Sequence, residues 1–155
     1  MKVATLGIVL QRGNVLLAEK KIGEVGIGIL SGPGGKLERG ETLEGCLMRE
    51  THEELDIVLN PASLELVAVI EIYAAGEIDY CIYVYRAQIL CGEIKETAEM
   101  IPAWYPLDDL PYDRMYGADS RWFLRAARGE KFRAQVHYHE RAKGFLGINF
   151  LPFAS

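Results

Sequence analysis

The chain has 155 residues and a mass of 17.3 kDa, which is typical of a single domain, here 1–155, that can bury a hydrophobic core. No apolar run reaches the ~18 residues of a membrane span, and the first residues lack the hydrophobic run and cleavage site of a signal peptide. The net charge of -5 argues against a protein that coats extended nucleic acid, because binding a phosphate backbone requires clustered Lys and Arg. We therefore expect a soluble, cytoplasmic protein without a membrane partner, whereas a single nucleotide carried with its metal is compatible with this charge.

The first residues predict a hairpin followed by a long loop. Residues 3–10 and 15–20 are rich in β-branched and aliphatic residues and flank turn formers at 11–14, which indicates two paired strands. Six glycines and Pro33 then occur within 23–35, too many for a regular element. We expect this loop to contribute flexible backbone to a functional site.

The next segment predicts an acidic helix. A helix is expected from about 42 to 55, with Thr42 as its N-cap. Glu50, Glu53 and Glu54 then stand at i, i+3 and i+4 on one face, where like charges repel each other. Oxygen ligands without His or Cys suit Mg²⁺ or Mn²⁺ better than zinc, so the face predicts a metal site for phosphate chemistry.

The rest of the chain predicts several strands and a second helix. The expected strands carry β-branched and aromatic residues and span 64–73, 78–89, 100–107, 132–138 and 145–150. The second helix is expected over 120–128, with Asp119 as its N-cap and Gly129 as its stop. Tyr80 and Ile82 alternate on one strand face and are interpreted as core residues. Strands with two intervening helices predict a mixed α/β sandwich.

The acidic helix and the loop before it carry a spaced motif. Its charged and glycine positions are Gly35, Glu41, Arg49, Glu50, Glu53 and Glu54. This spacing resembles the Nudix box of the Nudix hydrolases, with Thr51 in place of an aliphatic residue and Asp56 in place of a glycine. The resemblance implies a Nudix-type α/β/α sandwich with a mixed central sheet. It also implies hydrolysis of a nucleoside diphosphate linked to another group, by a water that a metal ion activates.

The resemblance also implies a set of metal ligands. These are the carbonyl oxygen of Gly35 and the carboxylates of Glu50, Glu53, Glu54 and Glu99. Glu96 is the alternative to Glu99 as the carboxylate from the later loop. Mg²⁺ is the expected cofactor, with Mn²⁺ as the alternative.

Catalytic roles follow from the same resemblance. Glu53 and Glu54 are both candidates for the base, beside their role as ligands with Glu50. Arg49 is expected to pair with and orient a glutamate, with direct phosphate contact as the alternative, because arginine suits a bidentate carboxylate bridge. Glu41 is expected to brace the helix against the loop.

Outside the box the chain resembles the MutT-type diphosphatases that remove oxidised purine nucleoside triphosphates such as 8-oxo-dGTP. The similar segments are 32–36, 102–111 and 115–123. The implied products are a nucleoside monophosphate and pyrophosphate, and the implied substrate-binding residues are Thr5, Lys20, Ser31, Tyr116 and Asp119. Three pocket positions depart from that branch: Tyr116 replaces a stacking Trp, Ala118 the first Asp of a pair, and Ser31 an Asn.

Several alternatives stay open at this point. The substrate could be a nucleotide sugar, a dinucleoside polyphosphate or an RNA 5′ end, or the domain could sense nucleotides without catalysis. Asp119 could serve only as a helix cap, and His137 with His139 could bind a transition metal instead of being ordinary surface or half-buried residues. The glycines match neither a P-loop nor a dinucleotide-binding fingerprint. A monomer is favoured, with a homodimer as the alternative.

Overall fold

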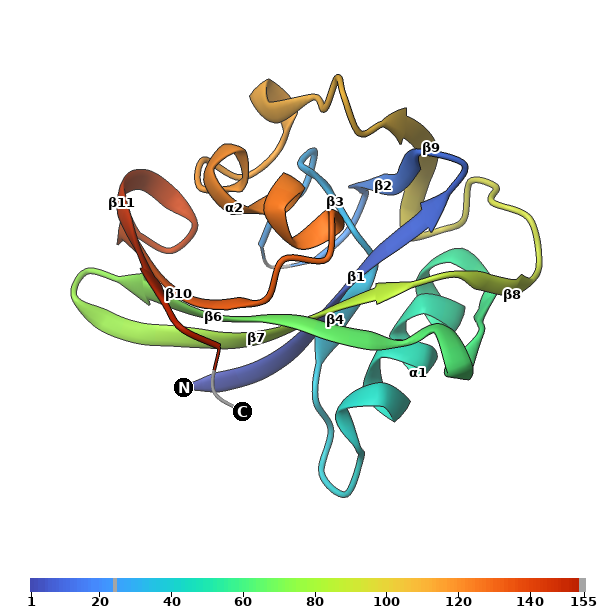
Figure 1. Ribbon diagram of the computed structural model, residues 1–155, viewed down its shortest axis with the longest axis horizontal. Coiled ribbons are helices and arrows are strands. Elements are labelled where there is room, and N and C mark those ends of the chain that lie inside the picture. The colour runs from blue at the N-terminus through green and yellow to red at the C-terminus, as the bar shows by residue number, and fades with distance from the viewer. Residues whose placement is uncertain (24, 154–155) are drawn as a thin grey trace.

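A computed structural model describes residues 1–23 and 25–153, and Figure 1 shows its arrangement of one curled sheet and two helices. The helices are α1 (Leu43–Leu55) and α2 (Asp119–Ala127), and the single-turn 3₁₀ helices are η1 (Pro61–Ser63) and η2 (Tyr112–Arg114). The strands are β1 (Lys2–Gln11), β2 (Asn14–Lys20), β3 (Leu30–Ser31), β4 (Gly34–Lys36), β5 (Val58–Leu59), β6 (Glu65–Ala74), β7 (Glu77–Ala87), β8 (Ile89–Cys91), β9 (Met100–Pro106), β10 (Phe132–Glu140) and β11 (Lys143–Leu151). In this described part of the chain, no helix is long and apolar enough to cross a membrane.

The main sheet is mixed. Its order is β11-β10-β6-β7-β1-β2-β3, with β4 paired to β1 and β9 paired to β2. The β1–β7 and β6–β10 pairs are parallel, and the neighbouring pairs are antiparallel. A second, two-stranded sheet is formed by β5 and β8. The predicted mixed α/β sandwich is confirmed.

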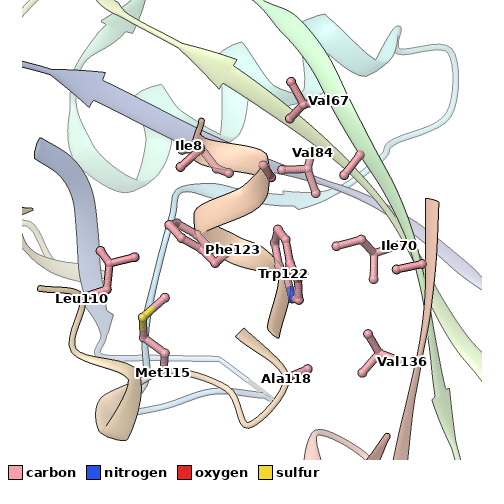
Figure 2. Close-up of a cluster of buried hydrophobic side chains, with 14 of the residues drawn as sticks. Ile8, Val67, Ile70, Val84, Leu110, Met115, Ala118, Trp122, Phe123 and Val136 are labelled. Carbon is pink, nitrogen blue, oxygen red and sulfur yellow. The ribbon is translucent and has the colours of Figure 1, made fainter. Parts of the chain in front are cut away.

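The two helices cover opposite faces of the sheet, so the core is divided into two clusters (Figure 1). Leu47 and Leu55 of α1 are fully buried in one cluster with residues of β1, β2 and β7. On the other face, Trp122 and Phe123 of α2 pack against Ile70 and other strand residues, as Figure 2 shows. Burying apolar area on both faces gives a sheet that is enclosed by helices on each side.

Local signals at α1 predict its ends correctly. The backbone amide of Gly45 donates to Oγ1 of Thr42 at 3.0 Å, as expected for an N-cap. At the other end Asp56 adopts a left-handed conformation (φ 57°, ψ 37°), and its amide donates to the His52 carbonyl at 2.9 Å. An aspartate can therefore end this helix where a glycine is usual.

The glycine-rich loop is more regular than its composition predicts. Residues 30–31 pair with β2, and residues 34–36 pair with β1, so the prediction of no regular element was wrong. The glycines permit this pairing: a Cβ on Gly32 would lie 2.1 Å from the carbonyl oxygen of Gly7, and one on Gly34 would lie 2.0 Å from that of Thr5. Residue 24 of the predicted loop lies outside the described residues.

The later elements confirm most of the predicted pattern, with two corrections. The predicted strand 78–89 is divided, since β7 ends at Ala87 and β8 pairs with β5 in the smaller sheet. Asp119 is not an N-cap: Ala118 occupies that position, and α2 starts at Asp119. The Asp119 carboxylate instead accepts a hydrogen bond from the amide of Tyr116, three residues earlier, at 3.2 Å. The predicted strands 132–138 and 145–150 are confirmed as β10 and β11, which are longer than predicted and form the closing hairpin.

Candidate active site

Strand β4 and helix α1 meet at the centre of the candidate site. The amide of Gly34 donates to Oε1 of Glu54 at 2.9 Å. Glu50 also faces β4, because a Cβ built on Gly35 would lie 2.5 Å from the Glu50 carboxylate. Only a glycine at position 35 leaves room for this carboxylate against the backbone. The structure therefore brings Gly35, Glu50 and Glu54 together, as the sequence predicts.

Arg49 is the hub of the acidic cluster. Its Nε and Nη2 donate to the two carboxylate oxygens of Glu41 at 2.6 and 2.9 Å, and its Nη1 donates to Glu50 at 2.8 Å and to Glu53 at 3.2 Å. The guanidinium also donates to the carbonyl of Lys36 at 3.3 Å. The fork geometry of arginine suits such a bidentate carboxylate bond. Arg49 thus contacts Glu41, Glu50 and Glu53 at once, and its orienting role stays a prediction.

Glu41 braces the loop before the helix. Its carboxylate accepts a hydrogen bond from the amide of Glu38 at 2.9 Å, in addition to those from Arg49. The Arg49 hydrogen bonds, followed by the Glu38 amide, lower the pKa of Glu41 to about 2. Glu41 is therefore a carboxylate at neutral pH, which keeps the bridge between loop and helix charged.

Burial and neighbouring negative charges raise the pKa of two glutamates of the cluster, Glu54 and Glu50. Burial raises the pKa of Glu54 to about 8, with smaller contributions from the charges of Glu50 and Glu99 and against the hydrogen bond from the Gly34 amide. Burial also raises the pKa of Glu50, with additional effects from Glu53 and Glu99. Glu99 thus lies near both glutamates, whereas Glu96 pairs with Lys21 at 2.8 Å. Of the two predicted alternatives, Glu99 is the one beside the cluster.

This donor set fits a hard divalent cation. It offers several carboxylate oxygens beside the backbone of Gly35, and the negative charges raise the pKa of Glu50 and Glu54 in addition to burial, a cost that a cation would remove. Among residues 1–23 and 25–153, no three carboxylate, imidazole or thiol side chains already meet at the spacing of a metal site. Arg49 holds oxygens of Glu50 and Glu53 in this arrangement.

A cavity of about 250 Å³ begins at this cluster. Gly35 and Glu54 line it together with residues of the sheet and of α2. The five residues predicted to bind substrate all line it as well: Thr5, Lys20, Ser31, Tyr116 and Asp119. Thr5 and Asp119 are 114 positions apart in the sequence, yet they line the same cavity as residues of the acidic box.

Asp119 is a buried acid in the wall of this cavity. Its residue is 7% exposed, and burial raises its pKa to about 7, while the amide of Tyr116 and the side chain of Trp122 lower it. Burial also raises the pKa of Tyr116 to about 12, with Asp119 contributing. The Tyr116 hydroxyl lies where a Cβ on Gly26 would be. This part of the cavity wall, away from Glu54, thus combines an aromatic side chain with an acid whose pKa is near neutral.

Sequence reasoning missed several cavity residues. These are Asp79, Tyr80, Ile82, Trp122, Tyr138 and Arg141, from β7, α2 and the closing hairpin. Tyr80 lines the cavity, although the sequence predicts a core residue. The alternation of side chains along β7 predicts which face of the sheet Tyr80 lies on, but not that a cavity lies on that face. His137, by contrast, stacks on the ring of Tyr73 with centroids 4.9 Å apart, which supports its ordinary role.

Comparison with known proteins places these features in one family. Residues 1–126 match the family model described as NUDIX domain. The chain is 35% identical over 132 residues to the "Oxidized purine nucleoside triphosphate hydrolase" of Danio rerio, covering 84% of this chain and 83% of that protein. It is 32% identical over 141 residues to the protein of the same name from Mus musculus, covering 90% and 88%. The crystal structure of the MutT protein from Bacillus halodurans has the same fold, with a TM-score of 0.80, 23% identity and 97% of each chain covered. The chain therefore belongs to the NUDIX hydrolase family.

Proposed function

We propose that this enzyme hydrolyses oxidised purine nucleoside triphosphates, such as 8-oxo-dGTP, to the nucleoside monophosphate and pyrophosphate. The observation that carries this proposal is the single cavity that joins Gly35 and Glu54 of the acidic box to Tyr116 and Asp119. The names of the relatives from Danio rerio and Mus musculus support the same substrate class. The enzyme would act in the cytoplasm, as a monomer, on the nucleotide pool.

Enzymes of this family generally need a divalent metal ion, and we propose Mg²⁺ here, with Mn²⁺ as a substitute. The residues that would hold it are the carbonyl of Gly35 and the carboxylates of Glu50, Glu53, Glu54 and Glu99. When bound, such an ion neutralises charge on phosphate oxygens and activates water. Glu53 or Glu54 would accept the proton of the attacking water, and their separate replacement by Gln would show which one does.

The protein itself would position the rest of the nucleotide. Lys20 lines the cavity close to Glu54, since its positive charge lowers the pKa of that acid, and it would face the phosphates. The Tyr116 ring would stack on the purine, an interaction worth roughly 1–3 kcal/mol per base. Asp119 would bind the purine edge, either as a carboxylate that accepts a hydrogen bond from it or as a carboxylic acid that shares a proton with it.

A nucleotide panel tests the proposal. Oxidised purine triphosphates, unmodified purine and pyrimidine triphosphates, a nucleotide sugar, a dinucleoside polyphosphate and a 5′-triphosphorylated RNA are each assayed with Mg²⁺. We expect the highest kcat/KM for an oxidised purine triphosphate and release of pyrophosphate. A higher kcat/KM for a nucleotide sugar or a dinucleoside polyphosphate would contradict the substrate, and orthophosphate as the only first product would contradict the bond cleaved.

A further inference from the structure

Two hairpin ends meet at a part of the cavity wall that lies away from α1. The β6–β7 hairpin turns at 75–76 and the β10–β11 hairpin at 141–142, and both turns lie at the left of Figure 1, with α1 at the lower right. Nε and Nη2 of Arg141 donate to the two carboxylate oxygens of Asp79 at 2.9 and 2.7 Å. This bidentate contact, the Asp79–Arg141 pair, ties the two hairpins together. Arg141 lies beyond the segment 1–126 that matches the family model.

A β-bulge brings Asp79 to the cavity. In the β6–β7 register Ile72 pairs with Tyr80 and Tyr73 pairs with Ile78, so Asp79 is the extra residue between them. Consecutive residues of a regular strand point to opposite faces, but a bulge can turn one of them. Asp79 and Tyr80 accordingly both line the cavity. The Asp79 side chain is only 13% exposed, so it depends on Arg141 to compensate its charge.

The closing hairpin also contacts the segment 116–119, which carries the predicted base-binding residues Tyr116 and Asp119. The Tyr138 hydroxyl of β10 accepts a hydrogen bond from the amide of Ala118 at 3.2 Å, directly before Asp119. Tyr138, Arg141 and Ala142 all line the cavity. A shift of this hairpin would therefore change the cavity wall next to Asp119.

We propose that Asp79 and Arg141 are positioning residues that determine specificity: the pair fixes the β10–β11 turn as the wall against which the base of the nucleotide binds. The inference rests on the proposed function for the identity of that base as a purine. The Asp79–Arg141 pair affects nucleotide binding and not the acidic cluster. Its residues line the cavity from β7 and the β10–β11 turn, whereas the acidic cluster lies on α1 and β4. Misplacing a group that positions substrate by about 1 Å can change rates by up to ~10²-fold, so a loosened wall is measurable.

The test uses Arg141→Ala, Asp79→Asn and the double variant, with kcat, KM and melting temperature measured for each. Arg141→Ala should raise KM roughly tenfold for the nucleotide that the wild type hydrolyses best, with little change in kcat. It should also lower the melting temperature, because Asp79 is left buried and unpaired. The double variant removes that unpaired charge, so its melting temperature should recover while its KM stays high.

Arg125→Ala is the matched control. Arg125 makes a similar bidentate pair with Glu130, at 3.0 and 2.6 Å, but neither residue lines the cavity, so KM should be unchanged. The inference would be overturned by a wild-type KM in Arg141→Ala, or by a fall in its kcat alone. It would also be overturned if the KM of the double variant recovered together with its melting temperature. The wild-type nucleotide panel tests the proposed function, and the variant-to-wild-type ratio tests the pair, so the two can fail separately.

Discussion

The backbone amide of Gly34 donates a 2.9 Å hydrogen bond to the carboxylate of Glu54, 20 positions later in the chain. The bond fastens β4 to α1 and fixes one glutamate of the acidic box at the cavity wall. Glu54 is buried, 6% exposed, and its pKa is raised to about 8, chiefly by that burial. This carboxyl group therefore requires either a proton or a cation at neutral pH.

The first prediction is that a divalent cation replaces that proton. Because the folded pKa of Glu54 (about 8) exceeds its usual 4.5, the folded state binds the additional proton between these values. Stability is then present at low pH and falls as pH rises through this interval, by about 1.4 kcal/mol per unit at most. In chelator, the wild type should melt at a lower temperature at pH 8 than at pH 6, and Mg²⁺ should reverse the loss.

The matched variant for this prediction is Glu54→Gln. It keeps an oxygen that can accept the Gly34 hydrogen bond but has no charge, so Mg²⁺ should change its melting temperature much less at pH 8. Hydrolysis should be absent from the wild type in chelator, and the variant should lose at least ~10²-fold in rate with Mg²⁺ present. Full wild-type activity in chelator would refute the metal site.

The second prediction concerns the bidentate contact between Arg49 and Glu41. Arg49→Lys keeps the positive charge but cannot donate to two carboxylate oxygens in the same fixed geometry. Glu41, Glu50 and Glu53 would lose their common orientation, so kcat should fall at least tenfold, or about 1.4 kcal/mol in the barrier. Arg39→Lys, an exposed change in the same loop, is the control and should leave kcat unchanged. Equal kcat values in both variants would contradict the orienting role.

The predictable part of this structure is the part encoded locally. Thr42 caps α1 through a bond to Gly45, and the spacing of Glu50, Glu53 and Glu54 follows from helical periodicity alone. The position of Glu99 beside them was predictable only from the family resemblance, because it depends on how β9 pairs with β2. Local sequence thus predicts the acidic face but not the whole cluster.

The features that sequence reasoning missed depend on contacts between distant segments. Gly34 is part of a strand only because β4 pairs with β1, and the number of glycines in the loop does not predict that pairing. The bulge at Asp79 is defined by the register of two strands, so the carboxylate could not be assigned to the cavity. Asp119 was predicted as a cap from its residue type, but its side chain turns back to the amide of Tyr116. In the first two cases the pairing between strands decides the outcome. The Asp119 contact is local instead, and it was missed because α2 starts one residue earlier than predicted.

The third prediction is that Thr51→Val stabilises the protein. Thr51 is fully buried on α1, and its hydroxyl has no hydrogen-bond partner among the described residues. Leaving a buried polar group unsatisfied costs about 1–3 kcal/mol, and valine has nearly the same shape. The free energy of unfolding, measured with denaturant, should therefore rise by about 1 kcal/mol. Thr42→Val is the control of opposite sign: it removes the helix cap and should lower the free energy of unfolding by about 0.5–2 kcal/mol. If Thr51→Val instead destabilised the protein, the Thr51 hydroxyl would have a hydrogen-bond partner.

The last prediction is that Asp119→Asn separates purine binding from stability. The folded pKa of Asp119 is about 7 against a usual 3.8, so its protonated form stabilises the fold at low pH, and that stability is lost as pH rises between these values. Asparagine has no charge to bury, so the variant should be more stable than the wild type at pH 8, with little difference near pH 4. Its KM for oxidised purines should nevertheless rise, because an amide cannot replace an acid that accepts or shares a proton at the purine edge. Asp108→Asn, at an exposed position, is the control and should change neither quantity. If Asp119→Asn gained stability at pH 8 while keeping the wild-type KM for every purine, Asp119 would be a buried structural acid, and purine recognition would have to come from other residues of the cavity.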